Sequence, residues 1–226
     1  MSIIATALGD RRARTAWAPP ADRCGRLAGE RSRLRDAALI AGGAAWVAVL
    51  GQVSIPLGFT PVPLSLGTFA VLTAAGVLGR ARAGAAMILF LAAGLAGAPV
   101  FAGGQSGVGL ATMGYAVGYV FAAGLAGRAA GRAAGPAAGP AAERGPVRSY
   151  WRLVGLMAAG HLAIYLLGVP YLVAAANLGW ADGIVQGMAP FLPGDLLKTL
   201  AAAGTVWLPK TGRRGRARQP QRVRPG

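Results

Sequence analysis

An acid and a base lie three residues apart in the segment Pro193–Lys198. Asp195 and Lys198 are separated by two leucines, and they open an apolar stretch that predicts a helix over residues 193–208. Residues i and i+3 share one side of a helix, so the carboxylate and the ammonium point the same way. An ionisable side chain inside a bilayer costs about 2.5–3.5 kcal/mol on insertion scales, so it usually marks a functional site.

Two interpretations of this pair are open. Pro193 suits the first turn of a helix, where a missing N–H costs nothing, and the helix dipole favours Asp195 in the same turn. The pair is then either an internal ion pair that holds the start of the helix, or the polar floor of a pocket that opens to the outside. Apolar and aromatic side chains would form the rest of such a pocket.

The elements that must position the pair are predicted to lie in a membrane. Hydrophobic residues make up 54% of the chain and charged residues 13%, which is too apolar for an ordinary soluble domain. Apolar stretches approach or reach the roughly 20 residues that cross a bilayer. They lie at about 36–53, 64–79, 83–99, 110–127, 153–176 and 188–208. The predicted fold is therefore an all-α membrane protein, with residues 36–208 forming a compact bundle of six transmembrane helices.

Positive charge is concentrated between these stretches. Of the 23 Lys and Arg residues, eight lie in the first 35 positions, two at 80 and 82, five between 128 and 152, and seven after position 208. The connections on the other side contain no Lys or Arg. Because cytoplasmic loops collect these residues, we expect both termini in the cytoplasm and a multi-pass protein of the inner cell membrane. The basic segments are expected to lie near anionic membrane lipids rather than to bind nucleic acid.

Three segments have the composition of disordered chain. They are the basic tails 1–35 and 209–226 and the connection 128–152, which is rich in Ala, Gly, Pro and Arg. Repeated arginines and the lack of an apolar core before residue 36 argue against a secretory signal peptide. Cys24 is the single cysteine, which excludes an internal disulfide or a cysteine metal cluster. We expect neither a metal nor a cofactor.

Two connections on the outer side suit a ligand site. Residues 55–63 contain three prolines, which prevent a helix and favour an extended cover. Residues 99–109 are rich in glycine and uncharged, so their backbone can approach a ligand closely and present N–H groups. Phe101, Gln105 and Ser106 within this segment favour a ligand site over a plain connector.

Small residues indicate close contacts between helices. Ala37, Ala41 and Ala45 recur every four residues, a spacing that lets a second helix approach in lipid. That helix belongs either to this bundle or to another protein. Gly114 and Gly118 form a similar close-packing pair. His161 is the single histidine, and we expect a packed hydrogen-bonding residue rather than a metal ligand.

Several spaced motifs give the chain a resemblance to a known family. They are the segments 60–70 (TPVPLSLGTFA), 97–104 (GAPVFAGG), Gly114-Tyr115 with Gly118, and 193–198 (PGDLLK). In this order, over about residues 36–208, the chain resembles the BioY family, the biotin-binding S components of energy-coupling factor (ECF) vitamin transporters. The resemblance implies a protein that is not an enzyme and that captures biotin from the outside and passes it inward.

The resemblance also implies site residues and partners. The acid and base of the last helix line the biotin site, and the glycine-rich connection closes over it. The expected substrate-binding residues are Asp195, Lys198, Phe101, Gly103, Gly104, Gln105, Ser106 and Tyr115. An alanine stripe on the first helix, matched by Ala37, Ala41 and Ala45, docks a transmembrane coupling subunit and, through it, two ATPase subunits. The sequence contains no Gly-xxxx-Gly-Lys-Ser/Thr motif of its own, and it leaves open whether the protein works with this module or alone.

Biotin chemistry suits an acid beside a base. The ureido ring of biotin offers two N–H donors and a carbonyl acceptor. Asp195 can accept from an N–H, and Lys198 can donate to the carbonyl or to the valerate carboxylate. Two positions depart from the family pattern. Gly67 stands where members often have Gln, and residues 110–113 (LATM) replace a Gly-Pro-Thr-Gly run. A polar contact at position 67 is therefore lost or supplied elsewhere, for example by Gln105.

Two other functions remain open on the residues. An S component for a different small vitamin would share the architecture and the polar pair. A rhomboid-like intramembrane serine protease would use Ser106, which lies in a Gly-x-Ser-Gly pattern, with His161 as its base. The usual partner histidine of that family lies on the last helix, whereas His161 lies on the fifth predicted span.

Overall fold

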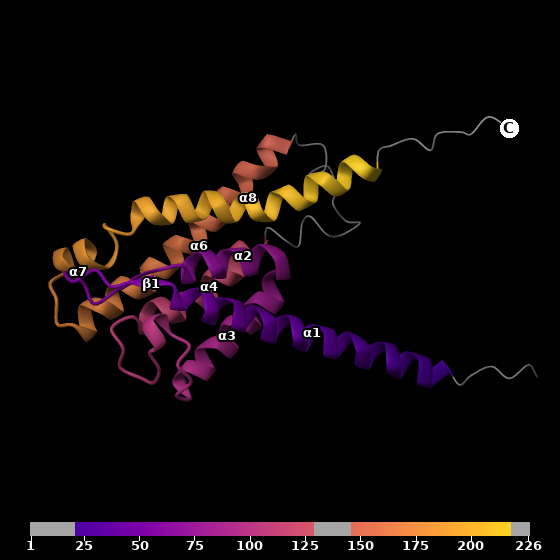
Figure 1. Cartoon of the computed structure of the whole chain (residues 1–226), viewed down its shortest axis with the longest axis horizontal. Helices are drawn as coiled ribbons and strands as arrows, with labels where there is room; N and C mark the ends of the chain where they lie inside the picture. Colours follow the sequence, from indigo (N-terminus) through magenta and orange to yellow (C-terminus); the bar gives the residue numbers. More distant parts are fainter. Residues whose placement is uncertain (1–20, 129–145, 218–226) are drawn as a thin grey trace, which may run out of the picture. The chain divides into compact units, whose positions relative to one another are not determined.

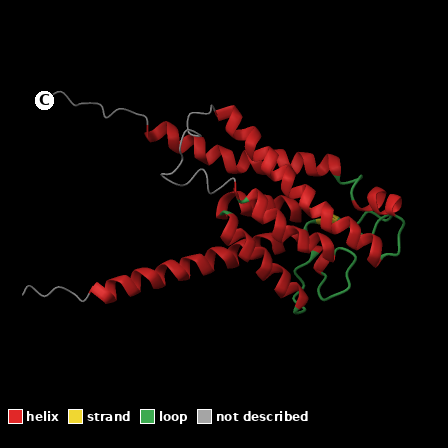
Figure 2. Ribbon diagram, turned by 180° about the vertical axis from the view of Figure 1, so that it is seen from behind, coloured by secondary structure: helices red, strands yellow, loops and turns green. Residues whose placement is uncertain are grey.

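The computed structural model describes residues 21–128 and 146–217. Within these residues the chain forms seven α-helices, a 3-10 turn and one short antiparallel strand pair (Figures 1 and 2). The helices are α1 (Ala21–Gln52), α2 (Gly67–Leu78), α3 (Arg80–Leu95), α4 (Met113–Ala126), α6 (Pro146–Ala175), α7 (Trp180–Gly187) and α8 (Leu192–Ala217). The 3-10 turn is η1 (Ala102–Gly104), and the strands are β1 (Ser54–Ile55) and β2 (Leu64–Ser65). The predicted helical class is confirmed.

The part of α1 before Leu39 is structurally separate, and the chain from Leu39 onward forms one compact unit. In this unit α4 packs mainly against α6, and α2 packs against α3, α4 and α8. The core between them is apolar, and its largest fully buried side chains include Leu72 of α2, Met87 of α3, and Met157 and Ile164 of α6.

The predicted close contact at Gly114 and Gly118 is confirmed. A Cβ atom added at Gly118 would lie 2.7 Å from the Ile164 Cα, and one at Gly114 would lie 2.6 Å from the Leu167 carbonyl oxygen. Both neighbours belong to the backbone of α6. The two glycines therefore let the backbones of α4 and α6 touch, as small residues do between helices in lipid.

The proline-rich connection is extended, as its composition predicts. β1 and β2 pair antiparallel, with Ser54 opposite Ser65 and Ile55 opposite Leu64. This pairing brings Ser65 back to the end of α1 and leads directly into α2. At the other end of α2, Gly79 makes a one-residue turn with φ +83°, a conformation that favours glycine, and α3 starts at once with Arg80.

The helices differ from the predicted segments in four places. α1 begins at Ala21 and α8 continues to Ala217, so part of each expected disordered tail is helical. α6 begins at Pro146, so the last part of the expected linker 128–152 is helical too. The arginines that gave these segments the composition of disordered tails are also good helix formers. α7 occupies an outer connection for which the apolar pattern predicted no helix. Residues 1–20, 129–145 and 218–226, which include most of the expected 128–152 linker, lie outside the described residues.

Some of the predicted spans are helices long enough to cross a membrane, and others are shorter. By length and composition, two helices in the described residues can cross a membrane: Glu30–Gln52 and Tyr150–Ala175. α2 and α4 are apolar but have 12 and 14 residues. At 1.5 Å per residue they measure about 18 and 21 Å, less than the roughly 30 Å of a hydrocarbon core. Strand β2 and the turn before Met113 fill the rest of these apolar stretches.

Candidate ligand-binding site

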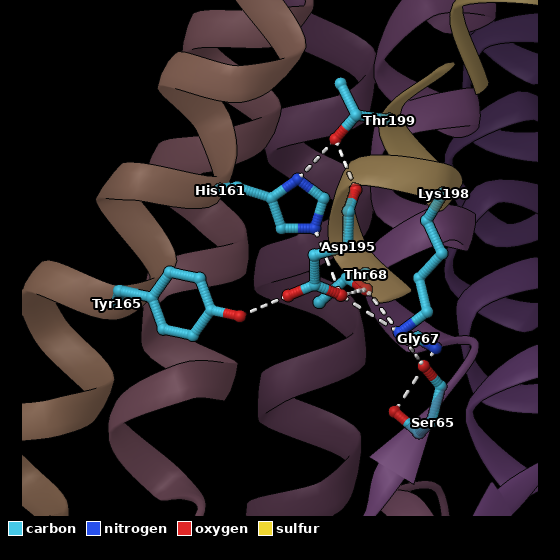
Figure 3. A network of polar contacts seen from close by, with 8 residues as sticks. All are labelled: Ser65, Gly67, Thr68, His161, Tyr165, Asp195, Lys198 and Thr199. Atoms are coloured by element: carbon cyan, nitrogen blue, oxygen red, sulfur yellow. Dashed lines mark hydrogen bonds and ion pairs between the residues drawn. The ribbon is translucent and has the colours of Figure 1, made fainter. Parts of the chain in front are cut away.

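Asp195 is the centre of a buried polar network (Figure 3). It lies in the first turn of α8 and is 6% exposed. The Tyr165 hydroxyl of α6 donates a hydrogen bond to its carboxylate, and Lys198 Nζ lies 3.0 Å from Oδ1. The Thr68 hydroxyl of α2 lies 3.4 Å from the same oxygen. Side chains from three helices therefore converge on one carboxylate.

The ammonium group of Lys198 also has all its hydrogen-bond partners within the protein. Its Nζ donates to the Ser65 carbonyl oxygen at 2.7 Å, to Asp195 Oδ1 at 3.0 Å and to the Thr68 hydroxyl at 3.4 Å. An ammonium has three N–H donors, and here each has an acceptor. The Ser65 contact depends on the β1–β2 pair, which fixes the backbone at the entry to α2. The ion pair of the first interpretation is thus present.

His161 of α6 lies behind the carboxylate. Its Nδ1 is 2.9 Å from the Thr199 hydroxyl, which also donates to the Asp195 carbonyl oxygen at 2.7 Å. Its Nε2 lies 3.6 Å from Asp195 Oδ1 and has no hydrogen-bond partner among the described residues. His161 is therefore a packed hydrogen-bonding residue, as the sequence predicts, and it packs against the site itself.

The network forms the polar end of a pocket, called the central pocket below. Asp195 and Lys198 line it together with Ser65, Gly67 and Thr68. Its aromatic walls come from Phe90, Phe101, Tyr115, Tyr119, Tyr165 and Phe191. Apolar walls with a few convergent polar groups are typical of small-molecule sites.

The predicted site residues divide into two groups. Asp195, Lys198, Phe101 and Tyr115 line the central pocket. Phe101 is 5% exposed and packs edge-on against Phe90, with ring centroids 5.5 Å apart. The Tyr115 hydroxyl donates to the Gly187 carbonyl oxygen at 2.9 Å. The remaining four predicted residues, Gly103, Gly104, Gln105 and Ser106, do not line the pocket, and the first three are exposed.

Gln52, at the end of α1, holds the glycine-rich connection. Its Oε1 accepts from the Gly104 backbone N–H at 2.8 Å. Its Nε2 lies 3.2 Å from the Phe101 carbonyl oxygen and 3.3 Å from that of Val100. This one amide therefore fixes both ends of η1 and keeps Phe101 turned into the pocket.

Gly67 leaves room for Tyr119. A Cβ atom at position 67 would lie 2.7 Å from the Tyr119 hydroxyl oxygen. The space that a larger residue would occupy is taken by a polar group from α4. Gln105, which the sequence suggested for this role, lies outside the pocket.

Sequence reasoning missed Tyr165, Thr68 and Gln52. Tyr165 lies four residues after His161, so the two polar side chains share one face of an apolar helix. That spacing is a signal that could have pointed to the site. Thr68 and Gln52 carry no comparable local signal.

Apolar helices around a buried polar network define a class of helical membrane proteins with a small-molecule site between the helices. The sequence model of the BioY family matches residues 25–213, most of the chain. The biotin transporter BioY of Rhizobium etli is 34% identical over 173 residues, which cover 75% of this chain and 89% of that protein. The biotin transporter BioY of Rhodobacter capsulatus is 33% identical over 180 residues, covering 74% and 88%. The chain belongs to the BioY family.

A solved structure has the same fold. It is the crystal structure of the S-component for biotin from an ECF-type ABC transporter. The TM-score is 0.66 at 22% sequence identity, and the match covers 84% of this chain and 94% of that one. The resemblance predicted from the motifs is confirmed.

Membership in a transporter family also means that the chain is not an enzyme, so the protease alternative is wrong. The geometry agrees, because the ring nitrogens of His161 face Thr199 and Asp195.

Proposed function

We propose that this protein takes up biotin across the cytoplasmic membrane, as the substrate-capture component of an ECF transporter. The observation that carries the proposal is the buried pair of Asp195 and Lys198 at the end of an aromatic-walled pocket. Support comes from relatives that are named biotin transporters and that the chain matches over almost nine-tenths of their length. The same names favour biotin over a different small vitamin.

Binding requires an exchange of hydrogen bonds. Every donor of Lys198 is directed at a protein oxygen, and the Asp195 carboxylate accepts from Tyr165 and Lys198. A ligand acceptor must therefore replace one of the Lys198 contacts, whereas the carboxylate, with about four lone-pair positions, still has room to accept from a ligand N–H. The two Thr68 contacts, at 3.4 Å each, are the longest in the network, so we propose that Thr68 yields first. Hydrogen bonds to charged groups contribute about 1.5–3 kcal/mol each, enough to repay the exchange.

We propose six membrane spans with both termini in the cytoplasm. The basic segments around the predicted spans support this orientation, since cytoplasmic loops collect Lys and Arg. Two helices have spanning length, and the fold matches that of a solved S-component. In this orientation α8 starts on the outer side. Asp195 then lies closer to the outer side than Lys198, which lies about 4.5 Å deeper along the helix axis.

We also propose that Ala37, Ala41 and Ala45 dock a transmembrane coupling subunit, which brings two ATPase subunits. All three alanines are exposed. The buried side of α1 is formed instead by Gly43, where an added Cβ would lie 2.7 Å from Leu78 Cδ1, and by its buried neighbour Ala44. Exposure of the stripe favours a partner protein over packing within the chain.

Calorimetric titration of the purified protein with biotin tests the function and the site. We expect tight binding, and we expect Asp195→Asn or Lys198→Ala to weaken it at least about tenfold, or roughly 1.4 kcal/mol. Asp182→Asn is the matched control, because Asp182 is exposed on α7. Absence of biotin binding by the unchanged protein would overturn the function. Unchanged affinity in both site variants would overturn only the site. Titration with thiamine or riboflavin tests the alternative of another vitamin.

A further inference from the structure

A second hollow lies on the outside of the helix pair α4–α6, and we call it the arginine groove. Of the residues that the structure describes, none lines both this hollow and the central pocket. It is lined by Arg80, Val120, Phe121, Gly124, Leu125, Arg128, Ala163, Leu166 and Leu167. Its volume of about 420 Å³ is comparable with the roughly 300–1,000 Å³ of ligand-binding clefts.

The groove has an apolar channel with a floor of small residues. A Cβ atom added at Gly124 would meet nothing within 4 Å, so this glycine leaves open space above the helix. Ala163 on α6 is the other small lining residue. Phe121 and Leu166 stand beside this floor and are 56% and 64% exposed. A hydrocarbon chain suits such a channel, whereas a flat helix face would offer it no depth.

Arg80 and Arg128 both line the groove, and a backbone contact between α3 and α4 brings them close together. A Cβ atom at Gly127 would lie 2.6 Å from the Arg80 Cα and 2.7 Å from its backbone nitrogen, so the end of α4 touches the start of α3. Arg128 follows directly. Both arginine side chains are exposed, and among the described residues neither takes part in an ion pair. None of the described residues that line the groove is acidic.

We propose that the arginine groove binds one anionic phospholipid, with an acyl chain along Gly124 and Ala163 and the phosphate at Arg80 and Arg128. The guanidinium group matches phosphate geometry through paired N–H donors. Basic pockets between transmembrane helices on the cytoplasmic side recognise anionic headgroups in this way. The leaflet follows from the proposed topology, in which both arginines face the cytoplasm. The site itself depends only on the groove.

Native mass spectrometry of the purified full chain tests this site. The probes are phosphatidylglycerol and phosphatidylcholine with identical palmitoyl and oleoyl chains, added separately at equal concentration. We expect one tightly retained phosphatidylglycerol, preferred over phosphatidylcholine by about tenfold, or roughly 1.4 kcal/mol. The double variant Arg80→Gln, Arg128→Gln should lose this preference. Gly124→Leu fills the channel and should lower retention of both lipids, which separates an acyl-chain site from a site for free phosphate.

Matched controls lie outside the groove. Gly155→Leu adds the same side chain at an exposed glycine of α6 that also has no neighbour within 4 Å of its Cβ position. Arg33→Gln removes an exposed arginine of α1. Both controls should retain phosphatidylglycerol as the unchanged protein does. Equal retention of the two lipids by the unchanged protein, or unaltered preference in the double variant, would overturn the proposal. Biotin titration of the same samples reports separately on the proposed function.

Discussion

Tyr165 is an uncharged residue that contacts the Asp195 carboxylate from a separate helix. Its hydroxyl donates to the carboxylate from α6, while Lys198 contacts the same carboxylate from within α8. Tyr165 also lines the central pocket, with its ring edge-on to Tyr115 at 6.5 Å between centroids. One side chain therefore both holds the acid in place and forms part of the wall that a ligand would touch.

Removal of the Tyr165 hydroxyl should weaken biotin binding. Tyr165→Phe keeps the ring and deletes one hydrogen bond to the carboxylate, so Asp195 is held less firmly and we expect the Kd for biotin to rise about tenfold, or roughly 1.4 kcal/mol. Calorimetric titration measures the change. Tyr150→Phe is the control, because the Tyr150 hydroxyl donates to the Leu200 carbonyl oxygen away from the pocket. Equal affinities of Tyr165→Phe and the unchanged protein would mean that Lys198 and Thr68 position Asp195 without Tyr165.

At this scale the sequence predicted the charged pair and missed its partners. Asp195 and Lys198 are three residues apart, so helix geometry alone puts them together. Thr68 lies 127 positions from Asp195, and Gln52 lies 49 positions from Phe101. Local periodicity carries no information about contacts that form only when distant helices pack. Tyr165, four residues from His161, is the exception, since a polar pair on one face of an apolar helix is readable.

The connection between α3 and α4 depends on the end of α1. Gln52 contacts the backbone on both sides of η1, where Gly103 and Gly104 adopt φ of +71° and +73°. Sequence reasoning predicted that this connection closes over the site, and the structure puts Phe101 there. The sequence also suggested that Gln105 makes polar contacts with the ligand, but the structure shows that Gln105 is exposed. Composition predicts which connection is special, but not which of its side chains turns inward.

Two glutamine variants separate these roles. Gln52→Leu removes the contacts to Gly104 and Phe101, so we expect faster amide hydrogen exchange over residues 99–107 and at least about threefold faster biotin dissociation, because loosened loops open locally. Gln105→Leu changes an exposed side chain, and both quantities should stay within experimental error. If Gln105→Leu produced the larger effect, the connection would have to rearrange when it meets the ligand.

For the whole molecule, the sequence predicted the helical class and the family better than the helix boundaries. Hydropathy counted β2 and the turn before Met113 as parts of spans, because an apolar extended segment and an apolar helix have the same composition. It located α1 and α8 but began α1 too late and ended α8 too early, because the arginines beyond both predicted spans were taken as signs of disordered chain. The spaced motifs identified the family because several motifs in a fixed order are more specific than any one of them.

The exposed alanine stripe of α1 can be tested as the proposed docking surface for the coupling subunit. Ala41→Leu with Ala45→Leu adds bulk to the outer face of α1, where neither side chain is buried. We expect recovery of the coupling subunit and ATPases from native membranes to fall at least about tenfold, because leucines prevent close helix approach. Biotin affinity should not change.

Ala158→Leu, at an exposed site on α6, is the control. Undiminished recovery would place the docking surface elsewhere, and no partners with the unchanged protein would mean that it works alone.

The pairing of Asp195 with Lys198 bears on how a captured molecule leaves. An isolated charge in a low-dielectric interior costs several kcal/mol, so a site with a lone acid or base would resist being emptied. Here the two charges lie 3.0 Å apart and neutralise each other in the empty site. We therefore expect that departure of a ligand leaves neither charge without a partner, and that the pair lowers the work needed to release the ligand.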